Sequence, residues 1–484
     1  MKITLTLALL VATVAIHAQQ LVPILDPLIP VTPTNTNGST RPRITLVNDT
    51  IPLVTWTKTG SGNGIIYSSR WNGTAFDPAV QVTPSGLNVY CSGDEGGDVA
   101  ARGDTAFIVF FTTDSRTFSV RSVDGGMTWQ DTVRIDHQAP GDMSYTPDVQ
   151  ILRGGNPVIV FEQSDMTMTL TRMKVCRSSD GGQTYSMETD AHLGVTGIPC
   201  ECCPPALLVN DSMVYVFYRN NDNNLRNIVM TVSSDSGNTF PVISEFDQSN
   251  WTISACPTAG AEAMFYQDSI LATWKSANKI YYGCGHAVNG GESPHALLEP
   301  SLASTVVQKQ PSVCGSGDTV VYTWSDRRTA NYDVYVAISG SGPMQIATPS
   351  LFNDTTGTSE NGTQQNPHAV YANGKVHLVY QDLVTGIVIY RVATVGGGVS
   401  VPELEPAEVV NIYPVPATET FSYSSASTET ATVQVFSVTG ALVASYTNVR
   451  SGQVLNCSAL LPGTYTVLVT DAQGNESSSK LIKH

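Results

Sequence analysis

The sequence predicts an all-β chain: a six- or seven-bladed β-propeller followed by a small C-terminal β-sandwich. Three observations lead to this fold class. A strand pattern recurs roughly every fifty residues, Gly and Pro are abundant at 40 and 27 of 484 residues, and the composition changes near Gly396. Only 14% of the residues are charged, which favours short strands and turns over long charged helices.

The N-terminal residues are a predicted signal peptide, 1–18. Lys2 precedes an apolar stretch from Ile3 to Ile16, and cleavage is expected after Ala18. The stretch is shorter than the roughly 20 residues that cross a bilayer, so we expect no transmembrane segment in the mature chain. The Pro-rich N-terminal segment, 19–40, is expected to lie along the last blade and close the ring.

Seven similar units fill residues 41–395. Each has a short first strand, often introduced by Pro, a strongly apolar second strand, and a third strand that leads to a turn. Evenly spaced strands without helical periodicity are typical of propeller blades. Seven blades follow if every unit is a blade, and six if the first or last unit is shared. The second strands are 51–56, 106–111, 157–161, 213–218, 269–274, 319–324 and 375–380.

Three consecutive units end in Ser-x-Asp-x-Gly-x-Thr-aromatic, with aspartates at Asp124, Asp180 and Asp235. The Asp accepts backbone N–H groups across a turn, and the Gly supplies a positive φ. The motif resembles the Asp-box of sialidase-like propellers, where it is structural and lies on the face opposite the active site. The resemblance therefore indicates the fold rather than the chemistry.

The C-terminal part begins after a Gly, Pro and Glu linker, 396–406, and spans residues 407–484. It contains Tyr413-Pro-Val-Pro-Ala417, an alternating strand at 431–438, Pro462-Gly-Thr-Tyr465 and a basic tail. In this order the segments resemble the C-terminal sorting domain of the type IX secretion system. The resemblance implies transport across an outer membrane by that machinery, followed by release or attachment at the cell surface.

The resemblance to sialidases implies three arginines that clamp a carboxylate, a tyrosine nucleophile and an aspartate acid/base. Guanidinium groups suit such a clamp because their planar fork binds carboxylates bidentately. The Arg-Ile-Pro motif is absent, since the first unit begins Thr40-Arg-Pro-Arg-Ile44. The candidates at corresponding places are Arg43 (or Arg41), Arg219, Arg327 (or Arg328), Asp94 (or Glu95 or Asp98) and Tyr380 (or Tyr371).

The residues just after the second strands are expected to surround the mouth of the propeller. Nearly every unit places a charged residue there, although solvated loop ends are often charged without any function. These residues are Lys58, Asp114, Glu162, Arg219, Lys275, Asp326 to Arg328, Gln381 and Asp382.

Four cysteines are expected to meet at the same mouth: Cys200, Cys202 and Cys203 before the fourth unit and Cys256 before the fifth. The Cys-x-Cys-Cys element resembles one found in a subgroup of secreted sialidase-like proteins. Outside the cytoplasm, nearby thiols oxidise unless a metal holds them. We expect Cys256 to form a disulfide with one of the other three. Metal binding is the alternative, but the spacing is not that of a zinc knuckle, so no metal site is firmly predicted.

Two functions remain open, and both take an extracellular glycan or glycoprotein as partner. A sialidase-type glycoside hydrolase requires three converging arginines near a tyrosine paired with a carboxylate. A noncatalytic binding or adhesion propeller requires polar rims and aromatic platforms, for which the candidates are Trp71, Trp129 and Trp251. Neither function needs a cofactor. The net charge of -16 and pI of 4.8, with no Lys/Arg run, exclude a nucleic-acid partner.

Overall fold

The computed structural model describes residues 23–484 except 33–37, 61–62, 138, 140, 287–294, 341, 344–345, 347, 354–362, 396–409, 426–429, 439 and 472–475. The predicted signal peptide and the predicted linker lie outside the described residues. The chain divides into two compact units, Met1–Gly398 and Val399–His484. Nowhere in the described part does a helix occur that is long and apolar enough to cross a membrane.

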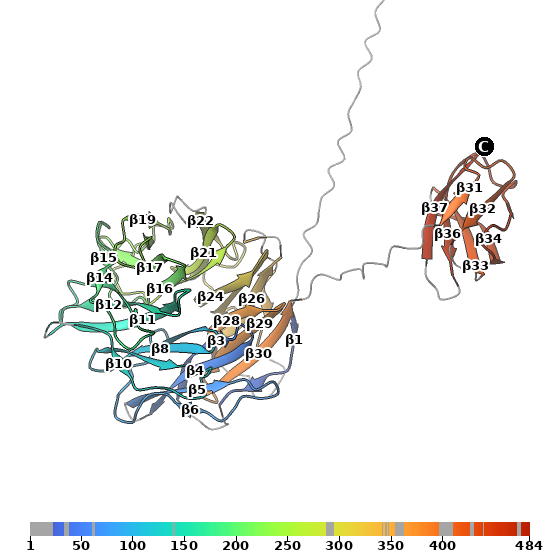
Figure 1. The fold of residues 1–484 in the computed structure, drawn as a ribbon. Coiled ribbons are helices and arrows are strands. Elements are labelled where there is room, and N and C mark those ends of the chain that lie inside the picture. The colour runs from blue at the N-terminus through green and yellow to red at the C-terminus, as the bar shows by residue number, and fades with distance from the viewer. Residues whose placement is uncertain are drawn as a thin grey trace, which may run out of the picture. The chain divides into compact units, whose positions relative to one another are not determined.

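The first unit is a seven-bladed β-propeller, in which each blade is an antiparallel sheet (Figure 1). The strands of blades 1 to 4 follow one another in the chain from the innermost strand outwards. Blade 1 has β3 (Ser39–Val47), β4 (Ile51–Gly60), β5 (Asn63–Arg70) and β6 (Val80–Gln81); blade 2 has β7 (Asp98–Arg102), β8 (Thr105–Phe111), β9 (Thr117–Ser122) and β10 (Val133–Arg134); blade 3 has β11 (Met143–Ile151), β12 (Pro157–Ser164), β13 (Arg172–Arg177) and β14 (Thr189–Asp190); blade 4 has β15 (Ile198–Pro199) and β16 (Ala206–Asn210), both paired with β17 (Met213–Asn221), then β18 (Ile228–Ser233) and β19 (Val242–Glu245).

Blades 5 to 7 follow the same plan. Blade 5 has β20 (Ala261–Tyr266), β21 (Ser269–Ser276), β22 (Lys279–His286) and β23 (His295–Leu297); blade 6 has β24 (Gln308–Ser316), β25 (Thr319–Asp326), β26 (Asp333–Ser339) and β27 (Ser350–Leu351); blade 7 has β28 (Gln364–Ala372), β29 (Lys375–Asp382), β30 (Ile387–Val395) and, outermost, β1 (Pro23–Leu25) and β2 (Ile29–Pro30).

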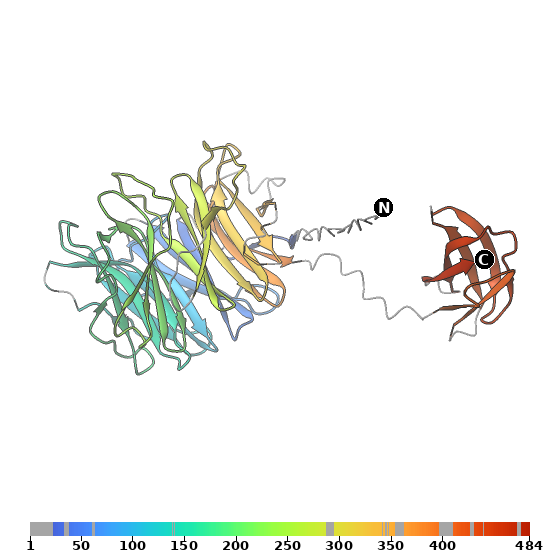
Figure 2. The ribbon, with the colours of Figure 1, turned by 90° about the horizontal axis from the view of Figure 1, so that it is seen from above.

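The ring closes in two ways. The innermost strands contact one another in chain order, and β28 of blade 7 contacts β3 of blade 1. The N-terminal strands complete the last blade as expected, since Pro23 to Leu25 pair with Val395 to Ala393 of β30. In Figures 1 and 2, β1 accordingly lies beside β30, although the two are more than 360 residues apart in the chain.

The hydrophobic core consists of layers between neighbouring blades. Between blades 7 and 1, for example, Val379 and Tyr390 pack with Ile44 and Trp56. Each second strand is apolar along most of its length because both of its faces are covered by adjacent sheets. The position of each innermost strand in the ring is therefore set by the packing of its blade against the two neighbouring blades.

Four of the innermost strands share a bulge near their start. Arg41, Thr146, Gln310 and Asn366 have φ of 48, 50, 55 and 55°, and each precedes a proline. The ladder to the second strand shifts register at each of these places. A bulge bends its strand and changes the direction in which nearby side chains point. The four bulges therefore change the direction of side chains at the centre of the ring, on β3, β11, β24 and β28.

The three Asp-box turns follow the third strands of blades 2, 3 and 4. In the second, Asp180 accepts hydrogen bonds from the Thr184 backbone N–H (2.9 Å), the Thr184 hydroxyl (2.6 Å) and the Ser178 hydroxyl (2.7 Å), and Gly182 has φ of 88°. Since strands alternate in direction, these turns lie at the opposite blade ends from the starts of the innermost strands.

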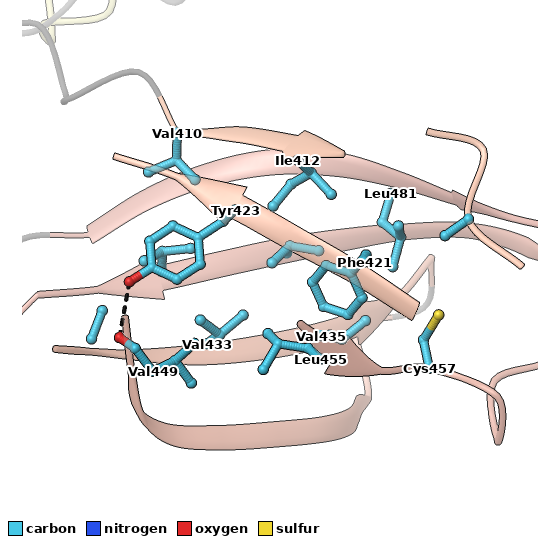
Figure 3. Close-up of a cluster of buried hydrophobic side chains, with 14 of the residues drawn as sticks. Val410, Ile412, Phe421, Tyr423, Val433, Val435, Val449, Leu455, Cys457 and Leu481 are labelled. Atoms are coloured by element: carbon cyan, nitrogen blue, oxygen red, sulfur yellow. Dashed lines mark hydrogen bonds between the residues drawn. The ribbon is translucent and has the colours of Figure 1, made fainter. Parts of the chain in front are cut away.

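The second unit is a β-sandwich. One sheet contains β31 (Asn411–Tyr413), β32 (Thr420–Ser424) and β35 (Leu455–Asn456), and the other contains β33 (Ala431–Ser437), β34 (Leu442–Val449), β36 (Gly463–Thr470) and β37 (Glu476–Lys483). Figure 3 shows Phe421 and Tyr423 packing with Val433 and Val435. The Tyr423 hydroxyl donates to the Val449 carbonyl at 3.0 Å.

Candidate functional site

A cavity of about 110 Å³ lies at the start of the innermost strands, and every blade contributes to its wall. Its lining combines four cationic side chains, four carboxyl side chains, prolines and small residues. The residues are Arg41, Arg43, Asp94, Asp98, Pro147, Asp148, Pro204, Pro205, Pro257, Thr258, Ala259, Gly260, Ala261, Glu262, Lys275, Lys309, Gln310, Pro311, Asn366 and Pro367.

Arg43 and Asp98 form an ion pair across blades 1 and 2. Arg43 Nε lies 3.3 Å from Asp98 Oδ2, and the two side chains are only 8% and 16% exposed. Burial alone would raise the pKa of Asp98, but Arg43 and Arg41 outweigh burial and hold that pKa below its ordinary value. Asp98 is therefore ionised at neutral pH inside the cavity.

Glu262, on β20 of blade 5, is the opposite case. Burial raises the pKa of Glu262 from 4.5 to about 7, in spite of the opposing attraction of Arg43. No hydrogen bond joins the Glu262 carboxyl to another residue of the described part of the chain. At neutral pH a large fraction of Glu262 carries a proton that it can donate to a ligand.

Asp148 is a third carboxyl of the cavity, and it is engaged with the backbone. Its two oxygens accept the N–H groups of Val149 (2.6 Å) and Leu207 (2.7 Å), which links the innermost strands of blades 3 and 4. Burial, with Asp98 and Glu262 nearby, raises its pKa well above the ordinary value. We therefore assign Asp148 to holding the wall.

A loop before blade 2 reaches across the cavity mouth. Gln310 of blade 6 donates to the Asp94 carboxylate at 2.7 Å and accepts the Asn366 N–H at 2.9 Å. Arg41 Nη1 donates to the Asp94 carbonyl at 2.6 Å. Blades 1, 6 and 7 thus fix this loop at the rim.

The cations of the cavity are not equally engaged. Arg41 Nε is buried and has no hydrogen-bond partner, and burial together with Arg43 lowers the pKa of Arg41 to about 10. Lys309 donates to Gln365 at 2.5 Å and lies 4.2 Å from the centre of the Tyr332 ring. Arg41 thus keeps one donor without a partner in the described part of the chain.

Of the five side chains predicted from the sialidase resemblance, the structure places Arg43 and Asp94 in the cavity and the other three elsewhere. Arg219 is fully buried, and it donates to the carbonyls of Ala259 (2.7 Å), Lys275 (2.5 Å) and Arg226. The guanidinium group of Arg219 is thus engaged in hydrogen bonds to backbone carbonyls.

Arg327 and Tyr380 are also away from the cavity. Arg327 is exposed and donates to the Ala330 carbonyl at 3.1 Å. Tyr380 is 0% exposed within the hydrophobic layer between blades 6 and 7. The cavity lining therefore contains two arginines, no third arginine and no tyrosine.

The predicted ring of charges after the second strands was one strand too far out. Of those residues, only Lys275 lines the cavity. The start of each first strand lies beside the end of the second, as Gln308 pairs with Asp326, so both lie at the same end of the blade. The first strand is nearer the axis, and its side chains occupy the centre.

Asp98 was an alternative candidate for the acid, but Asp148, Glu262 and Gln310 were not anticipated. A usable signal was present in the proline that marks the start of most first strands, as in Thr146-Pro147-Asp148 and Gln310-Pro311. Glu262 has no such neighbour, because Pro257 precedes it by five residues. Sequence pattern alone does not single it out.

The four cysteines lie together beside the cavity. A disulfide joins Cys202 to Cys256, which agrees with the expectation that Cys256 pairs with one of the other three. The four sulfur atoms lie within 4.8 Å of one another, which is the one arrangement of the described residues with the ligand types of a thiolate metal site. The chain continues from Cys203 and from Cys256 directly into cavity-lining prolines.

The comparisons with solved structures find distant likenesses. A protein of unknown function from Dyadobacter fermentans has a TM-score of 0.47 and 12% identity, covering 78% of this chain and 100% of its own. An α-L-arabinanase from Penicillium chrysogenum has a TM-score of 0.46 and 13% identity, covering 65% of this chain and 98% of its own. A sialidase from Trypanosoma rangeli has a TM-score of 0.41 and 13% identity, covering 94% of this chain and 87% of its own. No activity is transferred from these proteins.

The sequence comparisons concern the second unit. No curated protein matches the chain. Residues 411–484 match the family described as "Secretion system C-terminal sorting domain", and these residues form the β-sandwich strands from β31 to β37. The C-terminal unit is therefore a type IX secretion sorting domain, and the propeller that precedes it is cargo exported to the cell surface or beyond.

Proposed function

We propose that the propeller is a glycoside hydrolase that acts on extracellular glycans at its central cavity. The observation that carries this proposal is a pair of carboxyl groups that line one cavity and differ in their affinity for a proton. Asp98 is ionised beside Arg43, whereas Glu262 has a pKa of about 7. Hydrolysis of a glycosidic bond commonly uses such a pair.

In this proposal Glu262 is the general acid. It transfers its proton to the glycosidic oxygen as the bond to the anomeric carbon breaks. The Asp98 carboxylate faces the positive charge that develops on the sugar ring, and water completes the hydrolysis. Arg41, which lines the same cavity, binds a hydroxyl or carboxylate oxygen of the sugar.

The composition of the cavity favours cleavage over simple binding. Noncatalytic sugar sites rely on aromatic platforms, and the cavity lining contains no aromatic side chain. The three candidate tryptophans pack elsewhere: Trp71 contacts Tyr390 and Phe76, Trp129 donates to Ser68 at 2.9 Å, and Trp251 lies under Arg219. The lining has two arginines, whereas the sialidase clamp for the sialic acid carboxylate has three. The proposed substrates therefore include glycosides other than sialosides.

The test is hydrolysis of a panel of fluorogenic glycosides, including a sialoside and an α-L-arabinofuranoside, by the mature protein. Asp98→Asn and Glu262→Gln should each lower kcat by about 10²-fold or more on any accepted substrate. The matched control is Asp131→Asn, which changes an exposed aspartate and should leave kcat unchanged.

Two results would count against the proposal. Turnover that survives both cavity substitutions would remove the carboxyl pair from the mechanism. Saturable binding of a glycan, without turnover of any glycoside, would favour the noncatalytic binding propeller.

A further inference from the structure

We propose that Cys200 and Cys203 form a second disulfide beside the Cys202–Cys256 bridge, so that all four clustered cysteines are oxidised in the exported protein. The two sulfur atoms are 3.3 Å apart, and both side chains are 0% exposed. The inference concerns the wall of the cavity and does not depend on the proposed hydrolase activity.

The local backbone suits this bond. The Cys203 N–H donates to the Cys200 carbonyl at 3.2 Å, which closes a four-residue turn. Such a turn brings its first and last Cα atoms within about 7 Å, and disulfides span Cα separations of about 4.4–6.8 Å. The two sulfurs, 3.3 Å apart, have to approach by only about 1.3 Å to reach the S–S bond length.

Neighbouring donors hold both sulfurs in place. Arg226 Nη1 lies 3.1 Å from Cys200 Sγ, and the Ala259 N–H lies 3.4 Å from Cys203 Sγ. Hydrogen bonding from Cys200 and the charge of Arg219 outweigh burial and lower the pKa of Cys203. In the folded chain Cys203 is accordingly the more nucleophilic sulfur of the pair, because the thiolate is the nucleophile in disulfide exchange.

The export route supplies the oxidising environment. During folding outside the cytoplasm, the Cys203 thiolate attacks an external disulfide and releases one thiolate from it. The Cys200 thiolate then attacks the Cys203 sulfur and releases the second. The protein gives up two electrons and two protons, and the external disulfide becomes two thiols. In the folded chain the new bond is buried and inaccessible to reductants.

A four-thiolate metal site is the competing arrangement. Four sulfurs within 4.8 Å of one another resemble the ligand set of a structural zinc site. However, the Cys202–Cys256 bridge uses two of these sulfurs, so only two thiols remain for a metal. Two thiols at contact distance in an oxidising compartment favour the disulfide.

The pair of bridges would fix two walls of the cavity. Cys203 precedes Pro204 and Pro205, and Cys256 precedes the lining segment 257–262 that ends in Glu262. The bridge through Cys202 joins these two segments to each other. The bridge between Cys200 and Cys203 would then hold the turn from which the first segment departs.

Peptide mass spectrometry of the wild-type mature protein tests the proposal. The protein is denatured with N-ethylmaleimide and without reductant, then digested with trypsin, which releases peptides 178–219 and 227–275. We expect these two peptides to be linked and to carry no maleimide. A linked pair that carries two maleimide groups would show that Cys200 and Cys203 are free thiols and would overturn the proposal.

A thiol count in denaturant with chelator gives a second measurement. Nine cysteines with two disulfides leave five reactive thiols, and the Cys200→Ser/Cys203→Ser variant should also give five. The control Cys457→Ser, in the sorting domain, should give four. Seven thiols in the wild type would overturn the proposal, and nine thiols with one equivalent of zinc would replace it with a metal site.

Discussion

The two ends of the propeller blades hold carboxylates of opposite character. At the Asp-box end, Asp235 is exposed to solvent and Asp124 is partly exposed, and hydrogen bonds from nearby hydroxyl and N–H groups lower their pKa values. At the cavity end, burial raises the pKa values of Asp148 and Glu262. Carboxyl groups at the two ends therefore differ in pKa because their surroundings differ, and only Glu262 of these four is a proton donor in the proposed mechanism.

The largest effect is expected from breaking the ion pair of the cavity. Arg43→Met removes the guanidinium and leaves Asp98 buried without its partner, which typically costs about 3–5 kcal/mol. We expect the free energy of unfolding at pH 7, measured by urea denaturation, to fall by about 3 kcal/mol. The loss should shrink at low pH, where Asp98 takes up a proton.

The double variant Arg43→Met/Asp98→Asn separates the lost pair from the unpaired charge. It should recover most of the stability lost in Arg43→Met, because no buried charge remains. If the double variant is as unstable as the single one, the cost arises from packing of the Arg43 side chain and not from the unpaired carboxylate.

Glu262→Gln should change the pH dependence of stability. The folded-state pKa of about 7 lies above the ordinary value of 4.5, so the folded state binds more protons between these values. Stability is then fully present below about pH 4.5 and falls as pH rises through about 7. The variant cannot ionise, so at pH 8 it should be more stable than the wild type by about 1–2 kcal/mol.

The measurement is urea unfolding at pH 5 and at pH 8 for both proteins. An equal difference at the two pH values would show that Glu262 has an ordinary pKa. That result would also remove the acid from the proposed mechanism, because a glutamate that is ionised at neutral pH has no proton to donate.

Sequence patterns predicted the architecture well because it depends on repeated features. The apolar second strands, the turns and the N-terminal strand of the last blade all follow from hydrophobic pattern and chain order. The sorting domain was recognisable from short motifs around Tyr413 and Pro462. Arg43 and Asp94 line the cavity because Arg43 lies near the start of the first strand of blade 1 and Asp94 precedes the first strand of blade 2.

Which other charged residues line the cavity depends on which of them form hydrogen bonds with the backbone instead. Arg219 and Glu262 look alike in the sequence, as single charged residues on apolar strands. Three carbonyls of three separate segments engage Arg219, whereas Glu262 faces the cavity. Such contacts arise only after the blades pack, so no pattern within one unit reveals them.

A smaller effect is expected at Gly96, in the loop at the cavity rim. A Cβ atom there would lie 2.6 Å from Arg41 Cδ and 3.0 Å from Cys91 Sγ. Gly96→Ala should therefore displace the Arg41 side chain and lower kcat/KM by about tenfold, or about 1.4 kcal/mol, with little change in stability. Gly93→Ala is the matched control, because a Cβ at Gly93 would meet nothing within 4 Å.

The smallest effect is expected at the Asp-box end. Asp124→Asn weakens the turn bonds to Thr128 and Ser122, but Asp124 is partly exposed and solvent screens its charge, so the cost should be about 0.5–1 kcal/mol. The pKa of Asp124 lies below its ordinary 3.8. Its contribution is therefore present above about pH 4 and lost as pH falls through the lowered pKa. Glycoside turnover should not change. A loss of turnover in Asp124→Asn without a loss of stability would contradict the proposal that the Asp-box end supports only the fold and the cavity end carries the activity.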